Sequence, residues 1–217
     1  MKYLVHSCPD RKWYVDGFLV PSLKAQGIGS DEIIIWHDEY RKGNLQSFVD
    51  SCKFVGDMPG GTWHLQDDAI ICSDFAERTR KYDNGIICGF VNEVFGPDPT
   101  ACGLVPIKKM WNSFPCIRIP NDIAKEFAEW FEIVTSTRTK YQNWVAQKKF
   151  DDCFFRDFIM ECHEKDKAFN IKPCLVDHID FLLGGSVINQ WRGYYTRAVY
   201  WPETELIEKL KAEIKAR

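Results

Sequence analysis

Short apolar runs and helically spaced apolar positions alternate along the first part of the chain. Residues 2–7 have the pattern of a strand and end in a turn-like sequence at residues 7–10. Residues 33–36 are continuously apolar, which is typical of a strand buried on both faces of a parallel sheet. Helical spacing follows each run, and Asn44 is placed to cap the second helix. This alternation predicts an α/β fold with a mostly parallel central sheet flanked by helices.

The rest of the chain adds further elements of both kinds. We expect further strands at residues 62–65, 86–91 and 116–119. We expect helices at residues 13–26, with a kink or an N-terminal extension at Pro21, at 73–80, from Asn121, and at about 151–164. The last residues form an amphipathic helical pattern. We therefore predict one domain over residues 1–200 and a C-terminal amphipathic helix over residues 201–217, packed either on the domain or on a second subunit.

Composition and charge narrow the class of protein. The 217 residues carry 28 Lys and Arg against 31 Asp and Glu, so the chain lacks the basic excess of a general nucleic-acid binder. No apolar run is long enough to span a bilayer, and the N-terminus is charged too early for a secretory signal. None of the nine cysteines forms a Cys-x-x-Cys pair. We expect a cytoplasmic protein with reduced thiols.

The strongest candidate for chemistry is an acidic pair, Asp67 and Asp68, directly after the predicted strand at residues 62–65. Ligands of open α/β sheets bind beyond the carboxyl ends of the strands, so these acids lie at the expected site. Carboxylates are the ligands that hard divalent cations prefer, and such a cation often bridges them to phosphate. The alternative is that Asp68 or Asp74 caps a helix.

A strand followed by Gln66-Asp67-Asp68 resembles the Asp-x-Asp-type motif of GT-A-fold glycosyltransferases, in particular small bacterial and phage enzymes related to lipooligosaccharide glycosyltransferases. Gln66 stands where the strict motif has its first acid. The resemblance implies a GT-A-like, Rossmann-like fold. It also implies a nucleotide-sugar donor, usually a UDP-sugar, and Mn²⁺ or Mg²⁺ held by Asp68 and Asp67 through the donor diphosphate.

Other segments follow the order of that family. The turn after the first strand resembles its nucleotide-recognition segment, where Arg11 would contact base or phosphate. Asp38 would lie near the base or ribose, and Lys42 belongs to the loop that follows. Residues 173–178 resemble the C-terminal segment whose histidine, here His178, completes the metal site. Arg11 and Asp38 are equally compatible with surface ion pairs, and His178 with a structural role.

The resemblance also points to a base and to a closing segment. An acid at Asp151 or Asp152 would deprotonate the acceptor hydroxyl or hydrogen-bond the sugar; the alternative is a helix N-cap. We favour Asp152 as the base. A Gly-rich stretch followed by basic and aromatic residues, at 184–197, could close over the diphosphate, with Arg197 or Arg192 neutralising the leaving group. The alternatives for this stretch are contact with a nucleic-acid strand and a plain loop with an edge strand.

Together these features predict a metal-dependent hexosyltransferase that uses a nucleotide-diphosphate sugar. The acceptor stays open among a surface glycan, a small molecule, a protein and a hydroxymethylated DNA base, and so does the oligomeric state. The alternatives are a non-catalytic nucleotide-sugar binding module and a metal-dependent phosphohydrolase.

Overall fold

The computed structural model describes residues 1–90, 103–106, 115–147, 151–163, 168–172, 174–179 and 204–216. Seven strands form the central sheet, in the order β2-β1-β3-β7-β5-β8-β6, and two more form a ribbon, β4-β9. The sheet strands are β1 (Lys2–Ser7), β2 (Ile33–His37), β3 (Gly61–Leu65), β5 (Ile86–Cys88), β6 (Gly103–Pro106), β7 (Cys116–Pro120) and β8 (Ala168–Lys172). The ribbon consists of β4 (Ala69–Ile71) and β9 (Val176–His178).

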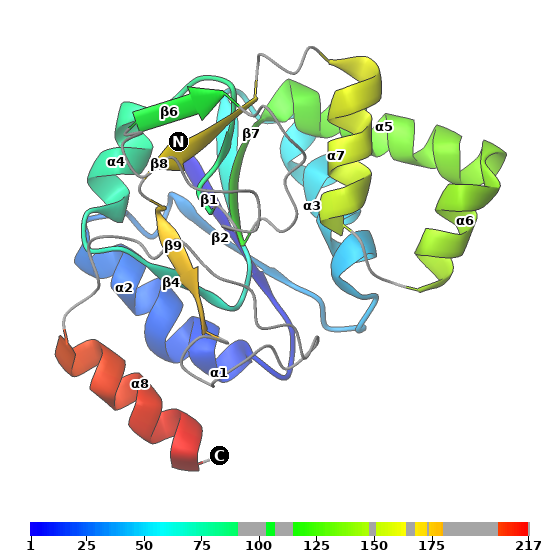
Figure 1. Cartoon of the computed structure of the whole chain (residues 1–217). Coiled ribbons are helices and arrows are strands. Elements are labelled where there is room, and N and C mark those ends of the chain that lie inside the picture. The colour runs from blue at the N-terminus through cyan, green and yellow to red at the C-terminus, as the bar shows by residue number, and fades with distance from the viewer. Residues whose placement is uncertain are drawn as a thin grey trace.

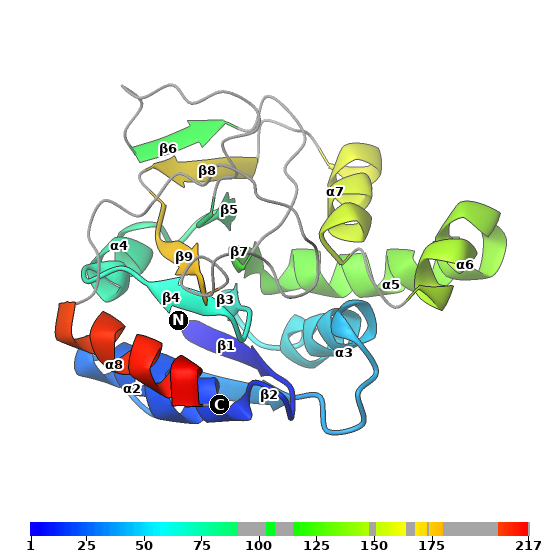
Figure 2. The same cartoon turned by 60° about the horizontal axis from the view of Figure 1, so that its bottom comes forward.

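Helices connect the strands and cover both faces of the sheet (Figure 1). They are α1 (Lys12–Tyr14), the π-helical turn η1 (Val15–Leu19), α2 (Val20–Ala25), α3 (Asn44–Gly56), α4 (Phe75–Lys81), α5 (Asn121–Thr137), α6 (Thr139–Ala146), α7 (Asp151–Cys162) and α8 (Thr204–Ala216). The helices α3, α5 and α7 lie on one side of the sheet, and α1, α2, α4 and α8 lie on the other (Figures 1 and 2).

The predicted α/β class with a mostly parallel sheet is confirmed. The strands β2, β1, β3, β5 and β8 share one direction, while β7 and β6 run against them. Both faces of β1 are buried, because Tyr3 and Val5 belong to the core beneath α1 and α2 while Leu4 belongs to the core beneath α3 and α5. Such burial on two faces is what a central strand of a parallel sheet requires.

The chain passes from β1 to β2 on one side of the sheet and then returns to β3 on the other side of β1. The order of strands therefore reverses at β1 and β3, which are parallel neighbours. Open α/β sheets bind ligands at such a switch point, in the crevice beyond the carboxyl ends of the strands. The residues after Ser7 and after Leu65 consequently lie at the position where the fold itself favours a binding site.

Two local predictions need correction, and a third, the irregularity at Pro21, is found and becomes more specific. The apolar run at residues 33–36 does form a strand, β2, but it is the edge of the sheet, and the Ile35 side chain is 49% exposed. Asn44 is the first residue of α3 and does not cap it; the N-cap position belongs to Gly43. The irregularity around Pro21 is a π-helical turn just before it, closed by the bond from the Val20 N–H to the Val15 carbonyl. Proline lacks the N–H that a regular helix would use there.

The C-terminal amphipathic pattern is found as α8. Leu210 is 2% exposed and belongs to the core beneath α1 and α2, with Ile214 packed against the same cluster. The helix therefore packs on the body of this chain. Within the described residues, no helix has the length and apolar character that crossing a bilayer requires.

Candidate functional site

The acidic pair occupies a tight turn between β3 and β4. The Ala69 N–H donates to the Gln66 carbonyl at 3.2 Å, which places Asp67 and Asp68 at the two central positions of the turn. The Gln66 N–H donates in turn to the Pro115 carbonyl at 2.8 Å. The backbone on both sides of the pair is thus fixed, so the carboxylates are held in place beyond the carboxyl end of β3.

Arg11 lies across both carboxylates. It follows the end of β1 and precedes α1, and its Nη1 is 3.2 Å from Asp67 Oδ1 and in closer contact with Asp68 Oδ2. The three side chains are largely withdrawn from solvent, at 20%, 17% and 7% exposure. The guanidinium compensates two adjacent negative charges that burial would otherwise penalise strongly.

His178 reaches the same acid from the ribbon. Its Nε2 lies 3.0 Å from Asp68 Oδ2, and the Ile179 N–H donates to the Asp68 carbonyl at 2.7 Å. The register of β4 with β9 pairs Ala69 with His178, which aligns these contacts. Sequence analysis placed Asp67, Asp68 and His178 in one site, and the structure brings the three together with Arg11.

The two acids differ in their pKa. Burial alone would raise the pKa of Asp68, but the His178 and Arg11 contacts outweigh it and lower the pKa to about 2. Burial and the charge of Asp68 raise the pKa of Asp67. One oxygen, Asp68 Oδ1, is buried without a hydrogen-bond partner in the part of the chain that the structure describes. A buried carboxylate oxygen left in this way is suited to accept a cation or a donor of a ligand.

The other two predicted nucleotide contacts lie one strand away, in the loop from β2 to α3. The two carboxylate oxygens of Asp38 accept the N–H groups of Lys42 and Gly43, at 2.9 and 3.0 Å. The Lys42 Nζ pairs with Asp50 of α3 at 2.8 Å. Both side chains therefore shape the loop at the carboxyl end of β2, on the side of β1 opposite to β3, and within the described residues Asp38 bonds to backbone N–H groups.

Asp151 and Asp152 begin α7, but their surroundings differ. The Asp151 carboxyl is buried at 6% exposure, with Oδ1 accepting from Asn44 Nδ2 at 2.9 Å and Oδ2 from Gln66 Nε2 at 3.1 Å. Asp152 is half-buried, and its Oδ1 accepts from the adjacent Cys153 N–H at 2.8 Å. Sequence analysis missed the roles of Asn44 and Gln66, although an amide where the motif has an acid was already a signal at residue 66.

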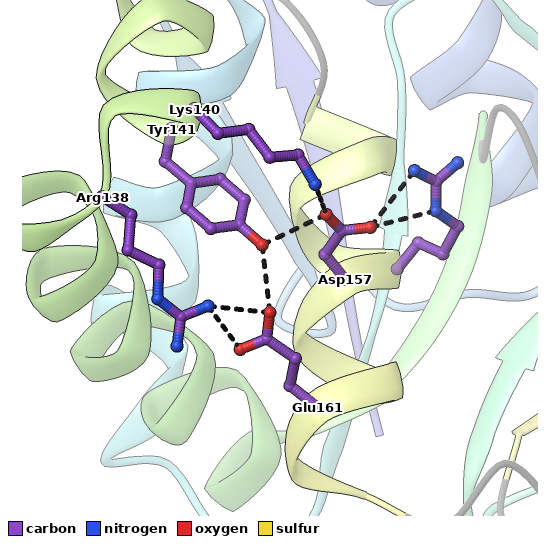
Figure 3. A network of polar contacts seen from close by, with 6 residues as sticks. Arg138, Lys140, Tyr141, Asp157 and Glu161 are labelled. Atoms are coloured by element: carbon purple, nitrogen blue, oxygen red, sulfur yellow. Dashed lines mark hydrogen bonds and ion pairs between the residues drawn. The ribbon is translucent and has the colours of Figure 1, made fainter.

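Away from the site, α7 makes ionic contacts with α6 and with Arg138, the residue between α5 and α6 (Figure 3). Arg138 donates to both oxygens of Glu161 at 2.8 and 2.7 Å, and Lys140 pairs with Asp157 at 2.6 Å. The Tyr141 hydroxyl lies between these two acids, 3.1 and 3.2 Å from their oxygens. Because these contacts hold the C-terminal half of α7, the first residue of the helix has a fixed place at the sheet.

Two of the predictions are not supported by the described structure: the bound metal ion, and the basic segment that closes over the diphosphate. Over the described ranges, no three His, Cys, Asp or Glu side chains are grouped so that they could hold a metal ion. With Arg11 bound across Asp67 and Asp68, a cation would have to replace its guanidinium. Arg192 and Arg197 lie outside the described residues.

Comparison with known proteins adds little. No protein-family model matches the chain, and no curated protein matches it. One matching solved structure is from Bacillus anthracis, is assigned as a glucose-1-phosphate thymidylyltransferase, and was crystallised in complex with a sucrose. The match has a TM-score of 0.40 and 11% identity, and covers 100% of this chain and 96% of the other. At that similarity, the functional assignment depends on the geometry of this chain.

Proposed function

We propose that the protein is a GT-A-like glycosyltransferase that moves a sugar from a nucleotide-diphosphate sugar to an acceptor hydroxyl. The observation that carries the proposal is the cluster at the switch point of the sheet. There Arg11 after β1 and the acidic pair after β3 meet His178 of β9, and the buried Asp151 lies beside them through Gln66. A cationic group, paired carboxylates and a separate buried carboxyl are the groups that diphosphate binding and proton transfer use.

As they stand, Asp67, Asp68 and His178 are not grouped to hold a metal ion, and Arg11 lies across both acids, so a divalent cation would require Arg11 to leave and the three side chains to move together. Their chemistry, two carboxylates and one imidazole nitrogen, suits the Mn²⁺ or Mg²⁺ class, and Asp68 Oδ1 is a buried oxygen with no hydrogen-bond partner among the described residues. Asp68, Asp67 and His178 would hold the ion, which would neutralise the diphosphate and so stabilise the leaving nucleotide. Arg11, released from the acids, would then be free to pair with a phosphate oxygen of the donor.

The transfer itself is a substitution at the anomeric carbon of the donor sugar. The acceptor oxygen forms a bond to that carbon, the bond from the carbon to the diphosphate oxygen breaks, and the nucleoside diphosphate leaves with the electron pair. The acceptor hydroxyl must lose its proton, and a carboxylate at the start of α7, Asp151 or Asp152, is placed to take it.

The proposal assigns the remaining contacts by position. Asp38 and Lys42, at the carboxyl end of β2, would face the base or ribose, and Arg197 would approach the diphosphate. A UDP-sugar is the donor that the resemblance favours. The acceptor hydroxyl belongs to a glycan, a small molecule, a protein or a modified DNA base, and a panel of these acceptors distinguishes the four.

The proposal is tested by thermal unfolding with a panel of nucleotide sugars, each with and without Mn²⁺. A ligand that binds only the folded state at 100 times its dissociation constant adds about 2.7 kcal/mol, which for a chain of this size raises Tm by about 5 to 10 °C. We expect one donor to produce such a shift in the presence of Mn²⁺, and Asp68→Asn to abolish it. The matched control is Asp57→Asn, an aspartate that is 80% exposed and precedes β3, whereas the acidic pair follows it.

Transfer is then measured with that donor as release of the nucleoside diphosphate in the presence of candidate acceptors. A protein that shows no shift with any donor and metal, and no release, would contradict the proposal. Release of phosphate from nucleotides without a sugar acceptor would favour the phosphohydrolase.

A further inference from the structure

The Asp151 carboxyl lies in a clamp of two neutral amides that come from separate elements. Asn44 begins α3, Gln66 follows β3, and Asp151 begins α7, so residues far apart in the sequence converge on one side chain. Each amide nitrogen donates to a different oxygen of the carboxylate, at 2.9 and 3.1 Å. Both oxygens are thereby oriented, because rotation of the carboxylate would break one bond or the other.

The backbone around each amide is itself fixed. The Gln66 N–H donates to the Pro115 carbonyl, and the Gln66 carbonyl accepts from the Ala69 N–H. The Asn44 side-chain oxygen accepts from the Leu45 N–H at 2.9 Å. Helix α3 packs on α7 through Phe48 and Phe155, whose ring centroids are 5.9 Å apart. The clamp is therefore built into the packing of α3, β3 and α7.

The electrostatics of the clamp differ from those of an ion pair. Burial raises the pKa of Asp151 to about 7, the negative charges of Asp152 and Asp68 contribute, and the backbone N–H groups at the start of α7 act in the opposite direction. Of the described residues, none with a positive charge pairs with this carboxyl. A carboxyl that gains and loses its proton near neutral pH is suited to serve as a general base.

An amide at residue 66 has a clear consequence. A glutamate there would add a third acid to the buried cluster and could not donate to Asp151 when ionised. Glutamine keeps the length of the side chain, supplies the hydrogen, and adds no charge. Gln66 therefore replaces the first acid of the motif with a group that serves Asp151.

We infer that Asn44 and Gln66 are positioning residues that hold Asp151, rather than Asp152, as the group that takes the proton from the acceptor hydroxyl. This inference rests on the proposed function. It corrects our preference for Asp152, whose carboxylate is half-buried and bound to its own helix.

The first test needs no substrate. The carboxyl carbon of Asp151 is followed by ¹³C NMR as a function of pH in the full-length protein, and its signal is identified by its loss in Asp151→Asn. Each lost donor removes stabilisation of the charged form, so Gln66→Met and Asn44→Ala should each raise the pKa of Asp151 by about one unit. The matched control is Gln46→Met, which removes a similar glutamine–aspartate bond (2.8 Å, to Asp50) within α3 and should leave the titration of Asp151 unchanged.

The second test uses the transfer reaction. In Gln66→Met the acid limb of the kcat–pH profile should move upward by the same amount as the NMR titration, while KM for the donor changes less than twofold. Gln66→Glu, which keeps the side-chain length, should not rescue the profile. Asp151→Asn should lower kcat at least 100-fold, and Asp152→Asn less than tenfold.

The outcomes separate the inference from the proposed function. An Asp151 titration that neither Gln66→Met nor Asn44→Ala moves overturns the positioning role, whatever the activity. A larger loss of kcat in Asp152→Asn than in Asp151→Asn overturns the choice of base. Absence of transfer in the wild-type protein, with the NMR shifts as expected, rejects the proposed function and leaves the clamp established.

Discussion

Asp68 and Asp151 are two buried aspartates near Gln66: the first follows it in the sequence, and the second accepts a hydrogen bond from its amide. Their pKa values are shifted in opposite directions. Asp68 contacts a guanidinium and an imidazole, and its pKa falls to about 2; Asp151 contacts two amides, and its pKa rises to about 7. Their exposures are nearly equal, at 5% and 6%. The kind of partner, and not the degree of burial, decides which carboxyl stays charged.

The difference has a chemical meaning. A carboxylate that stays ionised throughout the accessible pH range can hold a cation or an arginine but has little tendency to take a proton. A carboxyl that titrates near pH 7 can exchange a proton with a substrate. Under the proposed function, Asp68 would be the charge-holding group and Asp151 the proton-exchanging group, which is the division of roles that separated pKa values produce in known active sites.

The largest expected effect on the stability of the fold comes from Asp151→Asn. In an unfolded chain the pKa of an aspartate is about 3.9, whereas in the folded protein that of Asp151 is about 7. The folded state holds the additional proton between these values, so raising the pH from 4 to 7 removes stability. Asp151→Asn should abolish this dependence and be more stable than wild type at pH 8, by up to about 4 kcal/mol in urea unfolding.

At pH 4 the same variant should match the wild type, because both then carry a neutral group at this position. Asp57→Asn, at an exposed site, keeps Asp151 and should therefore show the same difference in stability between the two pH values as the wild type. An Asp151→Asn variant that is equally destabilised at pH 4 and pH 8 would show that Asp151 is an ordinary structural acid.

The next effect is expected from Arg11→Gln. This substitution leaves Asp67 and Asp68 without the cation that lies across them, and breaking a buried ion pair by removing one partner costs about 3 kcal/mol. The loss should be measured by urea unfolding at pH 7 and should shrink toward pH 3, as the acids gain protons.

Arg41→Gln is the matched control. Arg41 makes a two-contact ion pair with Asp10, but both side chains are more than 60% exposed, at 62% and 66%. Solvent screens such a pair, so no resolvable change in stability is expected. If the two arginine variants lose equal stability, Arg11 does not stabilise the fold by compensating the buried charges of Asp67 and Asp68.

The smallest effect on stability concerns a buried histidine, His64, whose Nδ1 lies 3.4 Å from the Nε2 of a second histidine, His6. His64 is 2% exposed, its Nε2 has no hydrogen-bond partner in the described structure, and burial followed by the charge of His6 lowers its pKa well below the usual value. As the pH falls below about 6.5, His64 gains a proton in the unfolded chain but stays neutral in the folded protein. The free energy of unfolding therefore falls by about 1.4 kcal/mol per pH unit.

His64→Phe should remove this part of the acid sensitivity, because phenylalanine does not titrate and fits beside Phe48, whose ring centroid lies 5.6 Å from that of His64. The measurement is the free energy of unfolding at pH 7, 6 and 5. An unchanged slope between these values would mean that His64 is protonated in the folded protein.

The sequence predicted the elements that bear the site better than the contacts within it. The carboxyl ends of β1 and β3 could be located because both strands are bounded by turn-forming residues, and Asp68 and His178 were correctly expected to meet. The apolar run of β2 was misjudged, since continuous apolar character does not distinguish a central strand from an edge strand that a helix covers in part.

The clamp could not be predicted, because it depends on tertiary contacts. Asn44 has the sequence features of a helix cap, and only the packing of α3 on α7 turns its amide toward Asp151. Arg11 was expected at the nucleotide, but its contacts with both acids depend on the turn at Asp67 and Asp68. The ribbon strands β4 and β9 span three residues each, too few for any periodic pattern to emerge.

The pairing of β4 with β9 also affects how the protein is made. The Asp68 carbonyl accepts a hydrogen bond from the Ile179 N–H, and its carboxylate contacts the His178 imidazole. Both partners belong to a segment that is translated long after the β3 turn. A growing chain that has produced β1 to β4 already contains Arg11 but still lacks these two contacts. The acidic turn therefore has its full set of contacts only when β9 has joined the ribbon.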